Sequence, residues 1–318
     1  MLCLLLLILC RYTGWGLGLF KSLFQSVSSF CNAGFDLIGS MNMIPFVTHR
    51  ITNITIMTLI TLGGLGFLVW DDISNSIKNG IKEKYSFGRI LRSFSLHTKL
   101  VLILQIVLVA IGTVGFLICE YNNPNTMADF NLADKLLIST FHSVSARTAG
   151  FMTVDLVYLK DITKMIMVGL MFIGGGPGGM AGGIKTTTFL VLILGVLTNI
   201  KGKKNINILK RTITNGTFVK AVSVVVIAVL LLALSNMLLV ANSDMDPLDL
   251  LFESVSAFAT VGLTNGALAQ MNTFCQGIII LLMYIGRVGT TTMAVAFVMK
   301  KPRENDLVVY AKENVIVG

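Results

Sequence analysis

Long apolar runs alternate with polar connections along this chain of 318 residues. Three runs, at 53–70, 100–118 and 221–241, contain no charged residue and approach the roughly 20 residues that cross about 30 Å of hydrocarbon. They predict membrane-spanning helices. Two further runs, at 165–199 and 274–299, contain Lys185 and Arg287 near their middles, where a charge is costly and usually functional.

The composition agrees with this pattern. Hydrophobic residues make up 54% of the chain and charged residues 13%, which leaves too little polar surface to cover a soluble globule of this size. The apolar segment 1–10 lacks a basic leading region and is interpreted as the remnant of a span rather than a signal peptide. The predicted fold class is therefore an all-α integral membrane protein whose main solvent is the lipid bilayer.

The net charge of +9 is concentrated in alternate connections, which favours a membrane protein over one that binds nucleic acid. By the positive-inside rule, the basic segments and the C-terminus are expected on the cytoplasmic side of a multi-pass protein in the cell membrane. An acidic outer mouth would attract cations. The basic residues are Lys78, Lys82, Lys84, Arg89, Arg92 and Lys99, then Lys201, Lys203, Lys204, Lys210, Arg211 and Lys220, then Lys300, Lys301, Arg303 and Lys312. The acidic residues are Glu120, Asp129 and Asp134, then Asp244, Asp246, Asp249 and Glu253.

One motif occurs three times. Each copy reads Phe-x-Ser-Val-Ser and reaches a glycine a few residues later, at Gly34, Gly150 and Gly262. These glycines lie 116 and 112 residues apart, which leaves room for one apolar span before each motif and one after it. The repeating unit is predicted to be a helix, a short re-entrant segment and a second helix.

The re-entrant segments are predicted to form a cation filter. Non-helical backbone at membrane depth is tolerated where it is buried in protein or lines a watery cavity, and carbonyls around an axis can replace the water shell of an alkali cation. Glycine supplies the unusual backbone angles that such a strand needs. The alternative is a small-residue motif for helix packing, which three evenly spaced copies make less attractive.

The repeats divide the chain at 1–95, 96–212 and 213–318. A fourth copy at the same spacing would lie before residue 1, so the N-terminus is expected to be truncated. The motifs 29–36, 145–151 and 259–264 resemble the second, third and fourth filter segments of the Trk/Ktr/HKT superfamily of potassium transporters, and the short tail is similar to its KtrB-type branch. The resemblance implies that backbone carbonyls of nine residues line the filter. These residues are Asn32, Ala33, Gly34, Thr148, Ala149, Gly150, Thr260, Val261 and Gly262.

The run 165–199 must break, because as one straight helix it would reach about 52 Å. Seven glycines and Pro177 fall within 173–188, and Ile184 separates Gly183 from Lys185, which does not fit a phosphate-binding loop. The resemblance implies a gating loop below the filter, with Lys185 facing the conduit. Glycines that merely allow close helix packing are the alternative. The glycines are Gly174, Gly175, Gly176, Gly178, Gly179, Gly182 and Gly183.

Arg287 resembles the superfamily's arginine that faces this loop, and it is expected to set the barrier for the ion or to hold the gate through loop carbonyls. A purely structural pair with a carboxylate is the alternative. Asp36 either adds negative potential at the mouth or caps the next helix. The isolated histidines His49, His97 and His142 are interpreted as loop or packing residues, and the five cysteines have no disulfide or zinc spacing.

The function expected from this resemblance is K⁺ uptake without covalent chemistry and without a bound cofactor, K⁺ being the transported ion and Na⁺ a candidate coupling ion. A membrane subunit of an ion-pumping ATPase complex and a non-conducting fragment are the alternatives. The first of these would need an intramembrane carboxylate, which the predicted spans lack. The resemblance also implies a homodimer and a cytoplasmic nucleotide-binding regulatory subunit, for which the basic loops suit docking as well as they suit anionic lipid.

Overall fold

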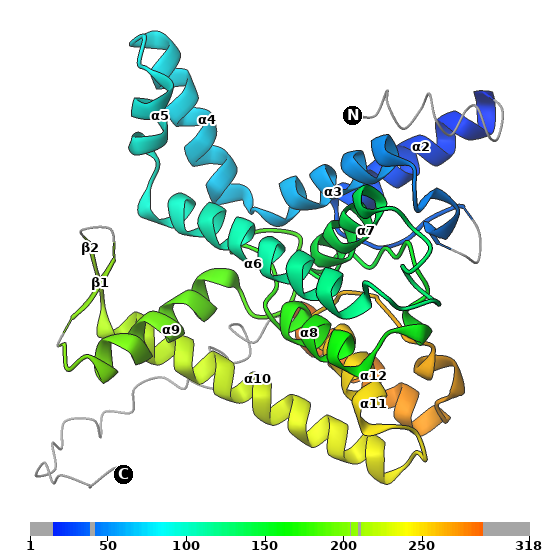
Figure 1. Cartoon of the computed structure of the whole chain (residues 1–318). Helices are drawn as coiled ribbons and strands as arrows, with labels where there is room; N and C mark the ends of the chain where they lie inside the picture. Colours follow the sequence, from blue (N-terminus) through cyan, green and yellow to red (C-terminus); the bar gives the residue numbers. More distant parts are fainter. Residues whose placement is uncertain (1–14, 39–41, 204, 209–210, 289–318) are drawn as a thin grey trace, which may run out of the picture.

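A computed structural model describes residues 15–38, 42–203, 205–208 and 211–288. The residues 1–10 and the tail, about which the sequence makes predictions, lie outside these ranges. Helices dominate the described part, and they are joined by short 3₁₀ turns and one small hairpin (Figure 1). The first half comprises α2 (Trp15–Phe30), η1 (Ile44–Phe46), α3 (Arg50–Gly64), α4 (Phe67–Lys82), α5 (Phe87–Ser93), α6 (Leu96–Glu120), α7 (Leu132–Ser145) and η2 (Leu156–Tyr158). The second half comprises α8 (Asp161–Phe172), α9 (Thr186–Ile200), β1 (Ile206–Ile208), β2 (Arg211–Ile213), α10 (Asn215–Ala241), α11 (Pro247–Phe258), η3 (Ala267–Gln270) and α12 (Thr273–Val288).

Two helices of the described part are long and apolar enough to cross a bilayer by themselves. They are α6 and α10, which follow the predicted runs 100–118 and 221–241. Both expose large apolar side chains, such as Ile106 at 70% and Met237 at 74%, where a soluble protein would carry polar ones. The outward face of each helix is therefore suited to lipid.

The run 53–70 is not one straight helix, so the prediction of a single continuous span there is wrong. Its residues divide between α3 and α4, whose axes meet at 97°. The bend falls at Gly66, which has φ +96° and ends the helical backbone. Backbone groups freed at the bend bind a segment more than 100 residues later, as described below, and so the local sequence alone does not show it.

The run 165–199 is broken, as its length predicts. Helix α8 ends at Phe172 and α9 begins at Thr186, and the glycine-rich segment 173–185 lies between them. A parallel bridge between Ile173 and Ile184 brings the two ends of the segment together. The predicted all-α class needs one small addition, the antiparallel hairpin of β1 and β2 in a connection.

Three short helices carry the repeated motif: α2, α7 and α11. Helix α7 packs between α6 and α3, whereas α11 packs against α8, α10 and α12. The motif residues of α7 and α11 are buried, including Phe141 and Phe252 with no exposed area. Each motif helix is too short to span, and α7 and α11 are packed among other helices, which agrees with the predicted re-entrant unit.

The basic connections lie on one side of the molecule. Figure 1 shows α4, α5 and the β1–β2 hairpin at the left, and the connections that follow α6 and α10 at the right. Several side chains of the predicted acidic connections are buried or paired rather than exposed to solvent. Glu120 and Glu253 are buried at the end of α6 and within α11, and Asp249 forms an ion pair of 2.6 Å with Lys164 of α8.

Candidate ion filter and gating loop

The three filter segments share one backbone conformation. In each, a residue with positive φ stands two positions before a glycine with positive φ: Asn32 and Gly34 at +51° and +74°, Thr148 and Gly150 at +73° and +79°, Thr260 and Gly262 at +53° and +87°. A positive φ is uncommon for a residue with a side chain. Its recurrence at the same place in three copies shows that the motif specifies the geometry.

The second serine of each motif fixes the segment that follows. The backbone N–H of the residue before each glycine donates to the carbonyl of this serine, at 2.8 to 2.9 Å. The serine hydroxyl then donates to the carbonyl just after the glycine: Ser28 to Phe35 at 2.6 Å, Ser145 to Phe151, and Ser256 to Leu263 at 2.6 Å. The serine thus stabilises its loop from both ends, which gives the repeated Ser-Val-Ser pattern a physical role.

The three glycines meet. A Cβ placed on Gly150 would lie 3.3 Å from the Cα of Gly34 and 3.5 Å from the Cα of Gly262, and it would overlap the carbonyl oxygen of Val261. A Cβ on Gly34 would lie 2.8 Å from the carbonyl oxygen of Ala149. Only glycine allows the backbones to approach so closely. The structure thereby brings the nine predicted filter residues into one cluster.

A cavity of about 640 Å³ opens on this cluster. It is lined by Asn32 and Ala33 of the copy that resembles the second filter segment of the superfamily, by Thr260, Val261 and Gly262 of the copy that resembles the fourth, and by Met180 and Arg287. It therefore connects two filter segments with the glycine-rich segment 173–185. Thr148, Ala149 and Gly150 are buried and do not line this cavity.

The glycine-rich segment, here called the gating loop, is the predicted gate. It packs into the bend between α3 and α4: Gly176 N–H donates to Gly64 at 2.9 Å, and the Phe67 N–H donates to Gly178 at 3.2 Å. A Cβ on Gly66 would overlap the carbonyl of Pro177, which explains the glycine at the bend. The bend is therefore the docking site of the loop.

The rest of the loop turns back toward the fourth filter segment. Hydrogen bonds within the loop run from Gly174 to Ile184 at 2.9 Å and from Gly179 to Gly176 at 3.1 Å. Gly175 accepts from Thr186 at 3.1 Å, and Gly183 has φ +65°. A Cβ on Gly182 would lie 2.6 Å from the carbonyl oxygen of Ala259. The loop thus reaches the fourth filter segment directly.

The two predicted gate cations both bind loop carbonyls. Arg287 donates to Met180 at 2.9 Å, and Lys185 donates to Ala181 at 2.7 Å. No ion pair with a carboxylate is found for either side chain within the described part of the chain. Of the two readings of Arg287, the structure favours contact with the loop over a structural carboxylate pair. Lys185 does not line the cavity at the filter.

Asp36 caps no helix. Its Oδ1 accepts from the Ile38 N–H at 2.9 Å within the turn after Gly34, whereas the N-cap of α3 is His49. The histidines agree with loop and packing roles: His49 caps α3, and His142 stacks on Phe116 with ring centroids 4.9 Å apart. His97 lies at the start of α6, beside a different cavity.

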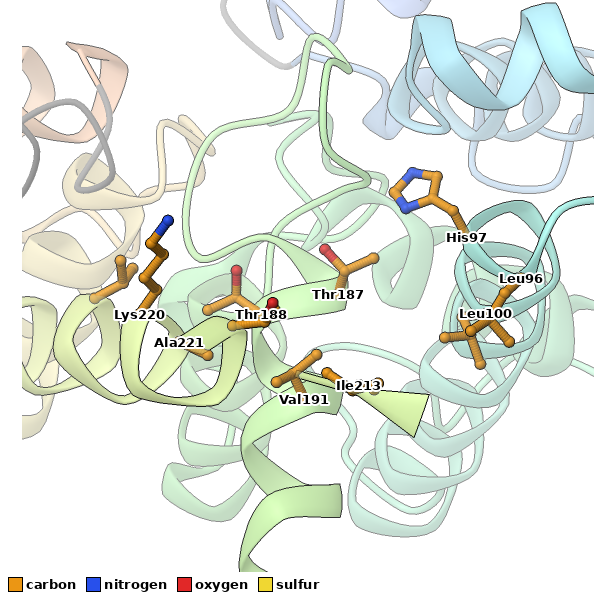
Figure 2. Close-up of a pocket in the computed structure, with 11 residues that line it drawn as sticks. Leu96, His97, Leu100, Thr187, Thr188, Val191, Ile213, Lys220 and Ala221 are labelled. Atoms are coloured by element: carbon orange, nitrogen blue, oxygen red, sulfur yellow. The ribbon is translucent and has the colours of Figure 1, made fainter. Parts of the chain in front are cut away.

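That cavity, of about 470 Å³, lies where the first turns of α6, α9 and α10 meet. Figure 2 shows His97 on one side, Lys220 on the other, and the hydroxyls of Thr187 and Thr188 between them. Its remaining lining is mostly apolar. It shares no lining residue with the cavity at the filter, and so we assign it no part in the candidate ion path.

Sequence reasoning missed one buried polar position in the motif. The x of Phe-x-Ser-Val-Ser is Gln25, His142 and Glu253 in the three copies, each nearly inaccessible to solvent. His142 Nε2 and Glu253 Oε1 both accept from the N–H three residues after the glycine, at 3.3 and 3.2 Å. The presence of a polar residue at this position in all three copies of a membrane motif could have indicated a buried polar contact.

Two carboxylates, Glu120 and Glu253, are buried just outside the predicted spans, which themselves contain none. Glu253 lies in α11, where Thr264 and Asn265 donate to it. Glu120 ends α6 and accepts from Asn123, Thr126, Thr163 and the Lys160 N–H. Because these donors satisfy both carboxylates, their positions fit a structural role better than ion carriage.

Comparison with known proteins places this geometry in a family. The model of the TrkH family, described as cation transport protein, matches residues 1–307, and the chain belongs to this family. The chain is similar to Ktr system potassium uptake protein B of Vibrio alginolyticus, with 37% identity over 96% of this chain and 64% of the relative. The corresponding protein of Bacillus subtilis shows 38% identity over 89% and 61%.

A third relative and a solved structure agree. The potassium/sodium uptake protein NtpJ of Enterococcus hirae is 33% identical over 96% of this chain and 65% of its own length. The crystal structure of the potassium transporter TrkH from Vibrio parahaemolyticus superposes with a TM-score of 0.71 over 93% of this chain and 62% of that chain, at 17% identity. The fold is thus that of an all-α membrane transporter, and the chain spans less than two thirds of the length of these relatives.

Proposed function

We propose that this chain forms most of the pore of a K⁺ uptake transporter in the cell membrane. Carbonyls of Asn32–Gly34, Thr148–Gly150 and Thr260–Gly262 replace the water shell of the ion, and the gating loop opens and closes the path below them. No group on the chain undergoes covalent change in such a process. The observation that carries the proposal is the meeting of three glycine-ended segments with one shared backbone conformation.

The loop suits a gate for two reasons. Its hydrogen bonds with the bend between α3 and α4 join backbone groups, and such bonds can break and re-form without unpacking a hydrophobic core. It also touches Ala259 and Thr260 of the fourth filter segment and lines the cavity through Met180. Moving the loop therefore changes the path next to the filter.

The choice of K⁺ as cargo is supported by the relatives, two of which are named potassium uptake proteins and one a potassium/sodium uptake protein. Na⁺ remains the candidate coupling ion. Competition of unlabelled K⁺ and Na⁺ against Rb⁺ uptake tests this choice. The proposal predicts strong competition by K⁺, whereas equal competition by Na⁺ contradicts K⁺ selectivity.

Growth and Rb⁺ uptake at low external K⁺, in a cell without its own K⁺ uptake systems, test the function itself. The chain is compared with a version extended upstream by one repeat period of its gene. Uptake by the extended chain alone supports both the function and the need for a further pore unit. Uptake by neither, at normal membrane abundance of both, contradicts the proposal and favours the alternative of a non-conducting fragment.

We further propose that the side with α4, α5 and the hairpin faces the cytoplasm, that the chain forms a homodimer, and that a nucleotide-binding regulatory subunit docks on this side. The concentration of basic residues there supports the orientation. The name "Ktr system" of two relatives supports a partner, since it describes one component of a larger assembly. Labelling of Ser86→Cys by an impermeant maleimide only in inverted vesicles, above the parent background, is the expected result.

A further inference from the structure

The three motif copies are numbered second, third and fourth after the superfamily segments that they resemble. The third copy differs from the other two at a position close to the filter. Two residues after the second serine, the second and fourth copies have Phe30 and Phe258, and the third has Arg147. The third copy also has one residue fewer between this serine and the glycine. An arginine thus stands directly before the filter residue Thr148, at the end of a buried helix.

In the second and fourth copies, the phenylalanine carbonyl is in contact with a glycine on the helix that follows the filter. A Cβ on Gly63 of α3 would overlap the Phe30 carbonyl oxygen, and a Cβ on Gly286 of α12 would overlap that of Phe258. The backbone of the helix after the filter is therefore in direct contact with the backbone at the end of the motif helix. The helix after the filter braces the end of the motif helix in both copies.

The third copy has no continuous helix for this brace, because the segment after its filter is broken where the gating loop starts. The guanidinium of Arg147 makes the connection instead. One terminal nitrogen donates to the carbonyl oxygen of Gly174 at 2.7 Å, and the other donates to Oε1 of Gln105 on α6 at 2.5 Å. The Arg147 side chain is buried, with the residue only 3% exposed.

The chemistry of this contact suits a fixed anchor. Arginine stays charged and offers several donors in one rigid plane, so it holds two acceptors in a set geometry. The far half of the loop also binds the bend between α3 and α4 through backbone hydrogen bonds, and the side chains that hold it differ from Arg147. Met180 is bound by Arg287, whose hydrogen bond is exposed, and Ala181 is bound by Lys185 of the loop itself. Water competes for exposed hydrogen bonds but not for the buried contact of Arg147.

We propose that Arg147 is a positioning residue that ties the third filter segment to the start of the gating loop, so that the loop moves about a fixed end at Gly174. Loop movement is then confined to the half near Met180, and the filter keeps its shape while the gate opens. This inference rests on the proposed role of the loop as a gate. It assigns different roles to the two arginines that bind the loop. Arg147 fixes the start of the loop at Gly174, and Arg287 holds Met180 through a hydrogen bond that breaks when the loop moves.

Hydrogen–deuterium exchange of the full chain in lipid nanodiscs tests the proposal without any transport measurement. Arg147→Gln is expected to speed exchange about tenfold or more in two separate segments, 146–151 of the filter and 173–176 of the loop, because both lose a charge-assisted hydrogen bond. Arg287→Gln is expected to speed exchange only in 178–183. Arg89→Gln, in the distant α5, is the matched control and should change neither.

Two variants keep the test decisive if Arg147→Gln folds poorly. Gln105→Leu removes the partner on α6 and leaves the filter and loop sequences intact, and it should speed exchange in the same two segments by a smaller factor. Arg147→Lys keeps the charge but not the planar pair of donors, and should protect both segments less than arginine does. Full protection in Arg147→Lys, unchanged segments in Gln105→Leu, or the same exchange pattern in Arg147→Gln and Arg287→Gln would each overturn the proposal.

Discussion

The second and fourth pore units differ from the third in how the end of the motif helix is held. In the second and fourth, Gly63 of α3 and Gly286 of α12 lie against the carbonyl of a phenylalanine. In the third, the helix is broken, and the guanidinium of Arg147 reaches the carbonyl of Gly174. Backbone packing fixes two units, and a side chain fixes the one that carries a loop. A repeat can thus lose the contact between helix and phenylalanine carbonyl and still keep its filter segment in place.

The largest effect on stability is expected from substitution of the two glycines that contact a phenylalanine carbonyl. Gly63→Ala and Gly286→Ala each put a methyl group into a phenylalanine carbonyl and should lower the free energy of unfolding by about 3 kcal/mol, at the upper end of overpacking costs. Gly277→Ala, in the same helix as Gly286, and Gly169→Ala, in α8 of the third unit, have no neighbouring atom within 4 Å of the new Cβ. Thermal unfolding in detergent should show the first pair destabilised and the second pair unchanged or stabilised. Equal effects in all four would contradict the comparison.

A smaller effect is expected from substitutions in the gating loop, which follows α8 in the third unit. If the loop is the gate, Gly182→Ala, whose methyl group would press against Ala259 and Thr260, should displace the loop and raise Rb⁺ uptake by the upstream-extended chain on the order of fivefold. Gly178→Ala is the control for backbone strain, since Gly178 also belongs to the loop and has φ +74° but no atom nearer than 3.8 Å. Reduced uptake by Gly182→Ala at equal abundance would argue against a gate in this position.

The three units should respond alike at the second serine of the motif. Ser28→Ala, Ser145→Ala and Ser256→Ala each remove one hydrogen bond to the carbonyl after the filter glycine, at a cost of about 1 kcal/mol. Unfolding midpoints of the three variants, measured side by side, check this. A large loss in one variant and none in the others would mean that the filter segments are not supported equally.

The smallest effect is expected at Asp36, in the turn after Gly34. Asp36→Asn keeps an oxygen for the Ile38 N–H and removes only a charge. Rb⁺ uptake at low ionic strength should change by less than about twofold, because the charge of the half-buried Asp36 remains in reach of water, which weakens its field. A larger fall, reversed at high salt, would instead assign Asp36 to the potential at the mouth.

The sequence predicts the positions of the candidate filter segments because the motif that marks them is local. Phe-x-Ser-Val-Ser, its glycine and the glycine-rich break are all visible as residue patterns, and the structure contains each where the pattern predicts it. The bend at Gly66 is different, since it depends on hydrogen bonds with Gly178 and Gly176, more than 100 residues away. A local apolar run gives no sign of such a partner, and so it was predicted as one straight helix.

The burial of charged residues was also beyond local reasoning. Glu253 and Glu120 appear in the sequence beside acidic connections, yet the structure surrounds each with hydrogen-bond donors from other segments. The contact of Arg147 with Gly174 is hidden for the same reason. The substitution of an arginine for phenylalanine is visible when the three motifs are aligned, but its acceptor is not.

The most direct test of the central account concerns the three glycines that meet at the filter. Rb⁺ uptake as a function of Rb⁺ concentration should be measured for the upstream-extended chain with Gly34→Ser, Gly150→Ser or Gly262→Ser, and with Gly277→Ser as the control. If the three segments form one cation path, each filter variant raises the half-saturating Rb⁺ concentration while the control does not, at equal membrane abundance. Unchanged half-saturation in any of the three filter variants would contradict the account.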